Sequence, residues 1–191
     1  MDFQKILLHS VIKEKGLFMK YFLGLIGCLY LFGCSTSVKQ YQNEKPTLQL
    51  DSYLNGDLVA QGVFMDRWGT VKKRFVVDMK ASWTSDGIGT LIEDFKWSDG
   101  SKTQRIWNLK KLADGKYEGT AADVDGKALG EAAGNAFNWA YTMNLDVDGT
   151  TWKVQFDDWM FLVDEKTLLN KAVMSKWGFR LGEVLISFQK K

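Results

Sequence analysis

Short runs of alternating apolar and polar residues, separated by glycine-containing turns, fill most of the chain beyond residue 56. In the stretch RFVVDMKASW, Phe75, Met79 and Trp83 share one side, whereas Arg74 and Asp78 share the other. Asn-Gly and Asp-Gly pairs recur between such runs and favour the positive φ angles of tight hairpins. A period of two is typical of strands with one buried face, so the sequence predicts an all-β fold.

Nine strands are predicted from this alternation. They are 57–66, 70–84, 89–98, 102–112, 116–123, 137–147, 151–163, 167–175 and 181–189. Short connections favour antiparallel pairing of consecutive strands. The exception is the stretch DVDGKALGEAAGNAF at 123–137, which could be a short strand with a loop or a helical turn. Because closure removes the two unpaired edges of a meander, we expect an antiparallel up-and-down barrel of about nine strands, as in lipocalin or calycin folds.

The N-terminal part of the chain is typical of an export signal. The apolar run at 21–32 is too short to span a membrane, which needs about 20 residues, and Lys20 precedes it. Cys34 follows at the boundary with a polar stretch, which resembles the lipobox of bacterial lipoproteins, where the cysteine receives a diacylglyceryl group. Cys28 also follows a glycine, but cleavage there would leave too short an apolar run. We therefore expect lipidation at Cys34, with a plain signal anchor as the alternative.

The predicted organisation has three parts: a signal peptide at 1–33, a lipidated tether at 34–46 and a barrel domain at 47–191. Whether translation starts at Met1 or Met19 stays open. Ser35 follows the cysteine in place of Asp. By resemblance to bacterial lipoproteins, this implies a lipid-anchored protein in the inner leaflet of the outer membrane, facing the periplasm.

Charge and residue types exclude several classes of function. The first 33 residues contain four of the 25 basic and two of the 23 acidic residues, so the rest of the chain has 21 of each. A neutral chain has no electrostatic basis for nucleic-acid binding. The lone histidine, His9, lies in the signal segment, and no cysteine follows Cys34, so catalysis by a histidine-assisted nucleophile and zinc sites built from these residues are excluded. We predict no metal and no cofactor, and we expect the basic run at 72–74 on the exposed face of a strand.

Three long stretches carry a resemblance to a known family. They are GVFMDRWGTVKKRFVVDM, EGTAADVDGKALGEAAGNAFNWAYTM and FDDWMFLVDEKTLLNKAVMSKWGFRLGEV. They resemble a family of uncharacterised lipoproteins of Gram-negative bacteria, named only as a domain of unknown function. The resemblance covers nearly all of the mature chain. It implies a periplasm-facing lipoprotein with a lipocalin-like barrel and no established activity.

Three charged residues fall on the apolar sides of predicted strands. Glu93 lies among apolar neighbours in TLIEDFKW, Arg105 in TQRIWNL and Asp158 in WKVQFDDWMFL. A tight turn at 99–100 would place Glu93 and Arg105 opposite each other. A buried carboxylate is costly unless it is paired or hydrogen-bonded. Two interpretations follow: the three residues bind the polar end of a ligand, or they form a structural ion pair in which loop backbone donates to Asp158.

Aromatic and small residues add further candidates. The inward aromatic residues Trp83, Trp97, Trp107 and Tyr141 are predicted to form the wall of a ligand pocket. Ten of the eighteen residues at 119–136 are Gly or Ala, which either leaves room for a ligand or accommodates bulky indoles. Trp159 and Phe161 are predicted to point outward, where they could contact a membrane or a partner, or cover an end of the barrel.

The sequence favours a binding protein over an enzyme. The first hypothesis is a lipid-anchored barrel that binds a small apolar or amphipathic ligand such as a fatty acid, with Arg105 as the partner of its carboxylate. The second is an isomerase- or cyclase-like enzyme that uses Glu93 or Asp158 as acid or base. The third is a structural lipoprotein of the envelope. No catalytic residue is assigned.

Overall fold

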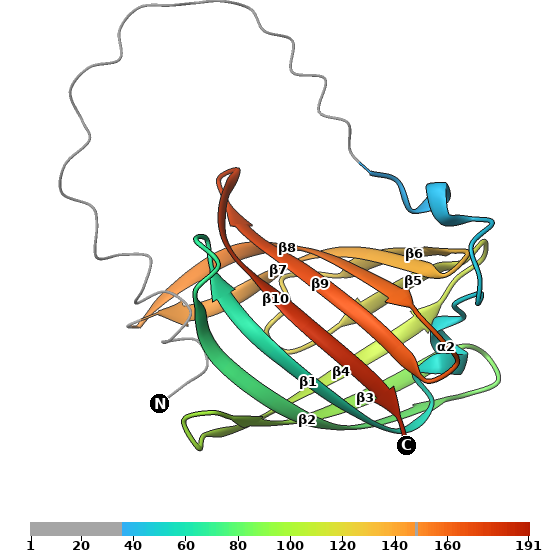
Figure 1. The fold of residues 1–191 in the computed structure, drawn as a ribbon, viewed down its shortest axis with the longest axis horizontal. Helices are drawn as coiled ribbons and strands as arrows, with labels where there is room; N and C mark the ends of the chain where they lie inside the picture. Colours follow the sequence, from blue (N-terminus) through green and yellow to red (C-terminus); the bar gives the residue numbers. More distant parts are fainter. Residues whose placement is uncertain (1–35, 148) are drawn as a thin grey trace, which may run out of the picture.

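Ten antiparallel strands close into one barrel in the part of the chain that the structure, a computed structural model, describes: residues 36–147 and 149–191 (Figure 1). The predicted signal peptide and Cys34 lie outside these residues. The strands are β1 (Gly56–Asp66), β2 (Val71–Trp83), β3 (Ile88–Trp97), β4 (Lys102–Lys111), β5 (Lys116–Thr120), β6 (Ala128–Ala133), β7 (Ala136–Val147), β8 (Thr150–Leu162), β9 (Thr167–Lys176) and β10 (Phe179–Lys190). The predicted all-β fold is confirmed.

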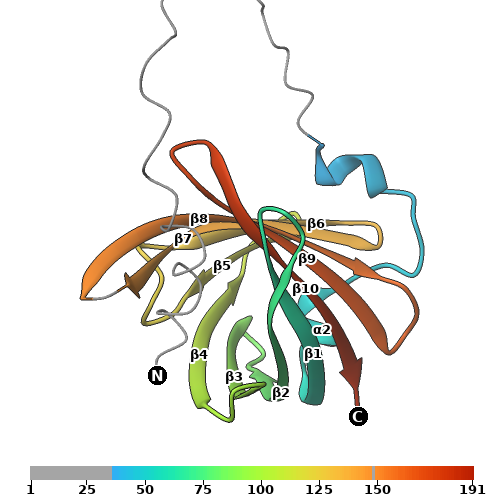
Figure 2. The same cartoon turned by 60° about the vertical axis from the view of Figure 1, so that its left-hand side comes forward.

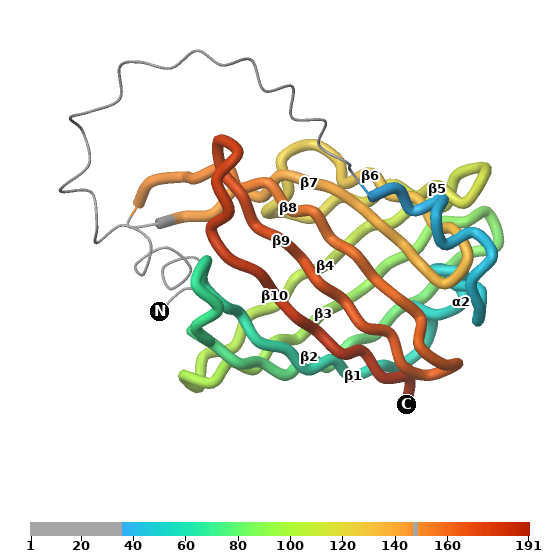
Figure 3. The backbone as a smooth tube through the Cα atoms, turned by 45° about the horizontal axis from the view of Figure 1, so that its top comes forward, coloured from blue at the N-terminus to red at the C-terminus, as the bar shows by residue number. Residues whose placement is uncertain are grey.

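Each strand pairs with its neighbours in sequence, and β1 pairs with β10 to close the sheet. The strands wind obliquely around the barrel (Figure 3). The ambiguous stretch at 123–137 contains the short strand β6 and a loop, which is why the barrel has one strand more than the nine predicted. All strands come from the described residues, so this part of the chain contains the whole closed barrel and its core.

The inward side of each strand forms the core, as the alternation predicts. Along β2, Phe75, Val77 and Met79 are buried. The prediction that the basic run at 72–74 lies on the exposed face is wrong for Lys73. This residue is on the inward side of β2, two positions before Phe75. Lys73 is 5% exposed, lies 2.9 Å from a carboxylate oxygen of Asp99 and sits over the Trp97 ring at 5.1 Å.

One end of the barrel, here called the closed end, is covered by the short helix α2 (Leu50–Tyr53) (Figure 1). Leu50 and Leu54 are buried there and reach the barrel interior. Two hydrogen bonds join the barrel to this segment. The Tyr117 hydroxyl donates to an Asp51 carboxylate oxygen at 2.7 Å, and the Trp83 indole N–H donates to the Leu54 carbonyl at 2.7 Å. The apolar face and the polar contacts together hold α2 in place.

The other end, here called the hairpin end, is formed by the turns at 66–71, 97–102 and 176–179 and by the loop at 121–127. No helix covers this end among the residues described in the structure. The turns that join β1 to β2 and β9 to β10 are neighbours, because β1 pairs with β10 from Leu58 to Asp66.

The segment that precedes α2 packs on the outer wall of the barrel. Its 3-10 helix η1 (Val38–Tyr41) lies against β6 and β7, and the Tyr41 ring meets Phe161 and Trp159 edge-on, with centroids 5.2 and 6.0 Å apart. The chain itself therefore covers these two outward aromatic residues, and part of the predicted tether contacts the barrel. Across residues 36–147 and 149–191, no helix combines the length and apolar character that crossing a membrane requires.

Candidate functional site

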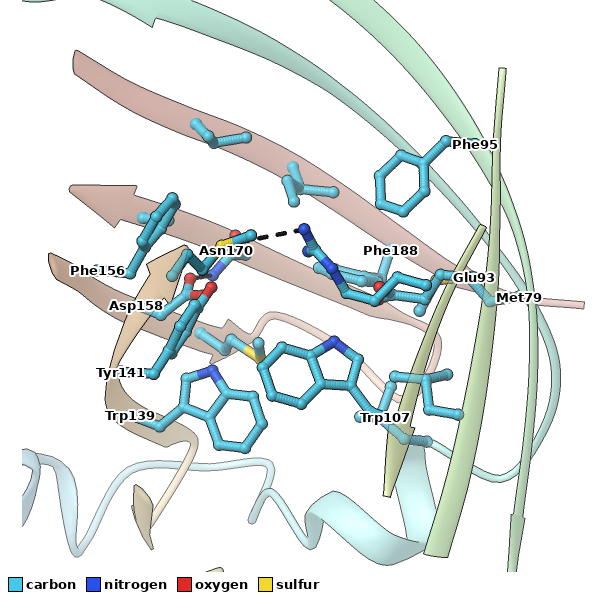
Figure 4. A pocket seen from close by; sticks show the side chains of 18 of the residues that line it. Met79, Glu93, Phe95, Trp107, Trp139, Tyr141, Phe156, Asp158, Asn170 and Phe188 are labelled. Atoms are coloured by element: carbon cyan, nitrogen blue, oxygen red, sulfur yellow. Dashed lines mark hydrogen bonds between the residues drawn. The ribbon is translucent and has the colours of Figure 1, made fainter. Parts of the chain in front are cut away.

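The barrel encloses a cavity of about 120 Å³ with a mostly aromatic and aliphatic lining (Figure 4). The three predicted inward charges, Glu93 on β3, Arg105 on β4 and Asp158 on β8, all line it. Three of the four predicted aromatic residues line it as well: Trp97, Trp107 and Tyr141. Trp83 instead lies at the closed end, where its indole bonds to Leu54 and packs edge-on against Tyr117.

Glu93 and Arg105 are direct cross-strand partners on β3 and β4, as the turn at 99–100 predicts. The ion pair of Arg105, however, is with Asp123, whose Oδ2 lies 2.7 Å from Nη2 and 3.1 Å from Nε. Asp123 belongs to the loop at 121–127, and Asn144 on β7 donates its backbone N–H to the Asp123 carbonyl at 2.8 Å. Asp123 was not predicted from the sequence, because its loop has no alternation that assigns a residue to one side.

Asp158 is held by side chains and not by the loop backbone that the structural interpretation expected. The Tyr141 hydroxyl donates to its Oδ2 at 2.8 Å, and Asn170 Nδ2 donates to its Oδ1. Asn170 also donates to the carbonyl of Trp159 at 3.1 Å, which fixes its orientation. Asn170 is 4% exposed and lies on an inward position of β9, so its polar character on an apolar side is the signal that could have identified it.

Burial dominates the electrostatics of this cluster. It raises the pKa of Glu93 to about 7, and the nearby Arg105 guanidinium only partly opposes this effect. Burial also raises the pKa of Asp158, although hydrogen bonds from Asn170 and Tyr141 favour its charged form. Burial and the adjacent Asp158 raise the pKa of Tyr141 well above its usual value, so its hydroxyl keeps its proton and remains a donor.

Two carboxyl groups, Glu93 and Asp158, therefore line the cavity together with Arg105, and a third, Asp123, already pairs with the Arg105 guanidinium. Such a cluster can accept hydrogen bonds from a ligand, and Glu93 can change its protonation near neutral pH. Within the described part of the chain, no group of three or more His, Cys, Asp or Glu side chains is arranged to hold a metal ion.

Sequence comparison places the chain in a family. The profile of DUF3833, described as a protein of unknown function, matches residues 28–190. The chain is a member of the DUF3833 family. The match spans the predicted lipidation site and the whole barrel, so the DUF3833 domain coincides with the fold described above. The comparison with curated proteins found no match.

Two solved structures resemble the DUF3833 barrel. A protein of unknown function from the DUF3598 family of Nostoc punctiforme is 13% identical, with a TM-score of 0.53; the match covers 78% of this chain and 51% of that one, so the chain spans about half of its length. The S-type phycobiliprotein lyase CPES from Guillardia theta is 6% identical, with a TM-score of 0.52; that match covers 73% of this chain and 89% of the lyase. At these identities the likeness shows the fold, and it confirms a lipocalin-like barrel.

Proposed function

We propose that this protein binds a small apolar or amphipathic ligand inside its barrel while a lipid on Cys34 holds it at the cell envelope. The observation that carries the proposal is the cavity: a largely apolar lining with a few convergent polar side chains is the usual composition of a small-molecule site. The likeness to the phycobiliprotein lyase is compatible with a barrel that holds a small molecule.

The size of the cavity limits the ligand. Its volume of about 120 Å³ is below the roughly 300–1,000 Å³ of typical ligand pockets. Four methionine side chains contribute to the lining, and methionine is flexible enough to move aside for a guest. These are Met79, Met143, Met160 and Met174. The protein therefore accepts either a very small ligand or a longer one that displaces these side chains.

The polar cluster favours a ligand whose head donates hydrogen bonds. The sequence suggested a fatty acid held by Arg105, but Asp123 already occupies that guanidinium at 2.7 Å. A carboxylate head would have to displace Asp123 and would face Glu93 and Asp158, which repel it when ionised. An alcohol or an amine would instead donate to these acceptors, so we favour such a head over a carboxylate.

Matched probes test this proposal on residues 36–191. We expect 1-octylamine or 1-octanol to change the tryptophan fluorescence of the protein and octanoate to bind more weakly. Ala172→Met should abolish binding because Ala172 is 4% exposed and lines the cavity. Ala140→Met, on the exposed side of β7, is the matched control. Mass spectrometry of lipids extracted from both variants gives a second readout. If no probe binds and the extracts do not differ, the cavity is a packing defect and the proposal is wrong.

The proposed anchor has its own test in the full chain. Cys34→Ser should leave an unprocessed precursor, because the thiol that receives the lipid is lost. Cys28→Ser should be processed normally and partition with outer membranes. The reverse pattern would assign the anchor to Cys28, and normal processing of both variants would argue against a lipoprotein.

Glu93 supports an enzyme as the second candidate. A carboxyl group with a pKa raised to about 7 inside a cavity is suited to general acid–base catalysis near neutral pH. Once a ligand is identified, prolonged incubation with the parent and with Glu93→Gln distinguishes the two functions. Chemical change of the ligand by the parent alone would indicate catalysis, whereas recovery of unchanged ligand from both indicates binding.

A further inference from the structure

Three large aromatic side chains on two neighbouring turns of the hairpin end are exposed to solvent. Trp177 and Phe179, on the β9–β10 turn, are 76% and 74% exposed, and Trp68, on the β1–β2 turn, is 59% exposed. The two turns are adjacent because β1 pairs with β10. Exposed apolar side chains that gather at one place on a protein mark an interaction surface more often than isolated ones do.

The backbone at Trp177 argues that this exposure has a use. Trp177 has a φ of 52° and precedes Gly178 with a φ of 79°, which is the left-handed geometry of a two-residue hairpin turn. Asn or Gly is favoured at the first of these positions, and a bulky aromatic residue is strained there. Its ring contacts Trp152, at 6.3 Å between centroids, and an indole that stays 76% exposed gains little from this packing to offset the strain. The contact with Trp152 therefore gives only a small reason for tryptophan at this strained position.

Basic side chains accompany the aromatic ones. The Arg67 guanidinium lies 4.0 Å from the centroid of the Trp68 ring, and the Lys176 ammonium lies 4.8 Å from that of Trp177. Tryptophan next to lysine or arginine is the combination enriched where proteins meet the headgroup layer of a membrane. The cations also complement the negative charge of anionic lipids. This chemistry selects a lipid surface over an apolar protein groove.

The N-terminal segment lies on the same side of the molecule as the β9–β10 turn. In Figure 1 and in Figure 2, which is turned about the vertical axis, the blue segment near residue 36 and the tip of β9–β10 both lie along the upper side of the barrel, the segment against β6 and β7 and the tip at the hairpin end. Because two residues span at most about 7 Å, a lipid on Cys34 would enter a membrane close to Thr36. A membrane that holds this lipid along the upper side would therefore face the β9–β10 turn, with the β1–β2 turn beside it.

We propose that the β1–β2 and β9–β10 turns dock on the surface of the membrane, with Trp68, Trp177 and Phe179 inserted among the lipid headgroups. The orientation rests on the proposed anchor at Cys34, but the docking chemistry does not. The lipid and the turns together would attach the barrel at two points and fix its orientation on the bilayer. A second, weaker contact gains strength when the first already holds the protein at the surface.

Sedimentation with lipid vesicles tests the docking without the anchor. Residues 36–191 contain the closed barrel, and this part of the chain is mixed with vesicles of phosphatidylcholine alone or of phosphatidylethanolamine and phosphatidylglycerol. We expect sedimentation with the anionic vesicles and weaker sedimentation with phosphatidylcholine. Changing Trp68, Trp177 and Phe179 to Ser should weaken binding by at least about ten-fold. The matched control changes Ile106, Leu129 and Val163 to Ser; these are also exposed but lie away from the two turns.

The outcomes are distinct. Docking is supported if the parent and the control sediment and the turn variant does not. It is overturned if the parent stays in solution, which would leave a protein partner for these aromatic residues, or if the turn variant and the parent sediment alike. Because residue 34 is absent from this experiment, a failure of the anchor at Cys34 would appear only in the processing test.

Discussion

The two ends of the barrel differ in whether their apolar side chains are buried or exposed. At the closed end, Leu50 of α2 and Leu54 just after it are buried, and Tyr117 and Trp83 form hydrogen bonds to this segment. At the hairpin end, Trp177 is exposed in a strained turn. Apolar surface that is removed from water stabilises a fold, whereas apolar surface left in water does not. The comparison indicates that the closed end serves stability and the hairpin end serves contact with something outside the protein.

The ion pair behind the hairpin end is expected to give the largest effect on stability. Arg105→Met leaves the Asp123 carboxylate, which lies 2.7 Å from the guanidinium, without its cation and strands Glu93 nearby. Removing one partner of a fully buried pair costs about 3–5 kcal/mol, and because these two side chains keep 18% and 24% of their surface exposed, a loss at the lower end of this range is expected. Urea unfolding should therefore show a loss of this order, and Asp123→Asn added to Arg105→Met should restore much of it. A single variant as stable as the parent would mean that this pair is effectively solvated.

A cavity at the closed end should cost nearly as much. Leu50 is 2% exposed, and truncating such a residue typically lowers the free energy of unfolding by about 2–5 kcal/mol. We expect Leu50→Ala to fall in this range in urea unfolding. Leu169→Ala, on the outer wall with 46% exposure, should change the stability by less than about 0.5 kcal/mol. Equal losses in the two variants would contradict the role assigned to α2.

Replacing Glu93 should stabilise the barrel, in contrast to the two preceding variants, and only at pH values where Glu93 ionises. Its pKa rises from 4.5 in the unfolded chain to about 7 in the barrel, so the unfolded chain loses this proton first as the pH rises. The stability of the parent should therefore fall between about pH 4.5 and pH 7, by roughly 3 kcal/mol from this group. Glu93→Gln cannot ionise, so its advantage over the parent should grow across this window and then level off. Urea unfolding of both proteins across this range measures the difference, and a flat difference would refute it.

The smallest effect is expected at the exposed turn. Trp177→Asn replaces an exposed indole with a residue that tolerates a φ of 52°, so the free energy of unfolding should rise or stay within about 1 kcal/mol of the parent. Thermal unfolding measures this change. A large loss of stability would show that the Trp177 indole supports the fold and would weaken the contrast between the two ends.

The sequence alone determined the class of fold and the side on which most residues lie. Because side chains alternate along a strand, Glu93, Arg105 and Asp158 could be assigned to the interior, and the turn at 99–100 set the register of the first two. The same rule, applied two residues before Phe75 on β2, would have placed Lys73 inside as well. Lipidation at Cys34 remains a prediction, because that residue lies outside the described part of the chain.

Only the tertiary structure decided which of these residues meet. Alternation reports the side of a sheet, but it does not report which strands face each other across a closed barrel. Asn170 and Tyr141 reach Asp158 because β7, β8 and β9 are adjacent in the barrel wall, and Asp123 reaches Arg105 from a loop that has no periodicity. The cover formed by α2 likewise depends on a cavity mouth that exists only after the sheet has closed. The physical reason is that alternation is a local property, whereas ion pairs, covers and cavities arise from contacts between residues far apart in the chain.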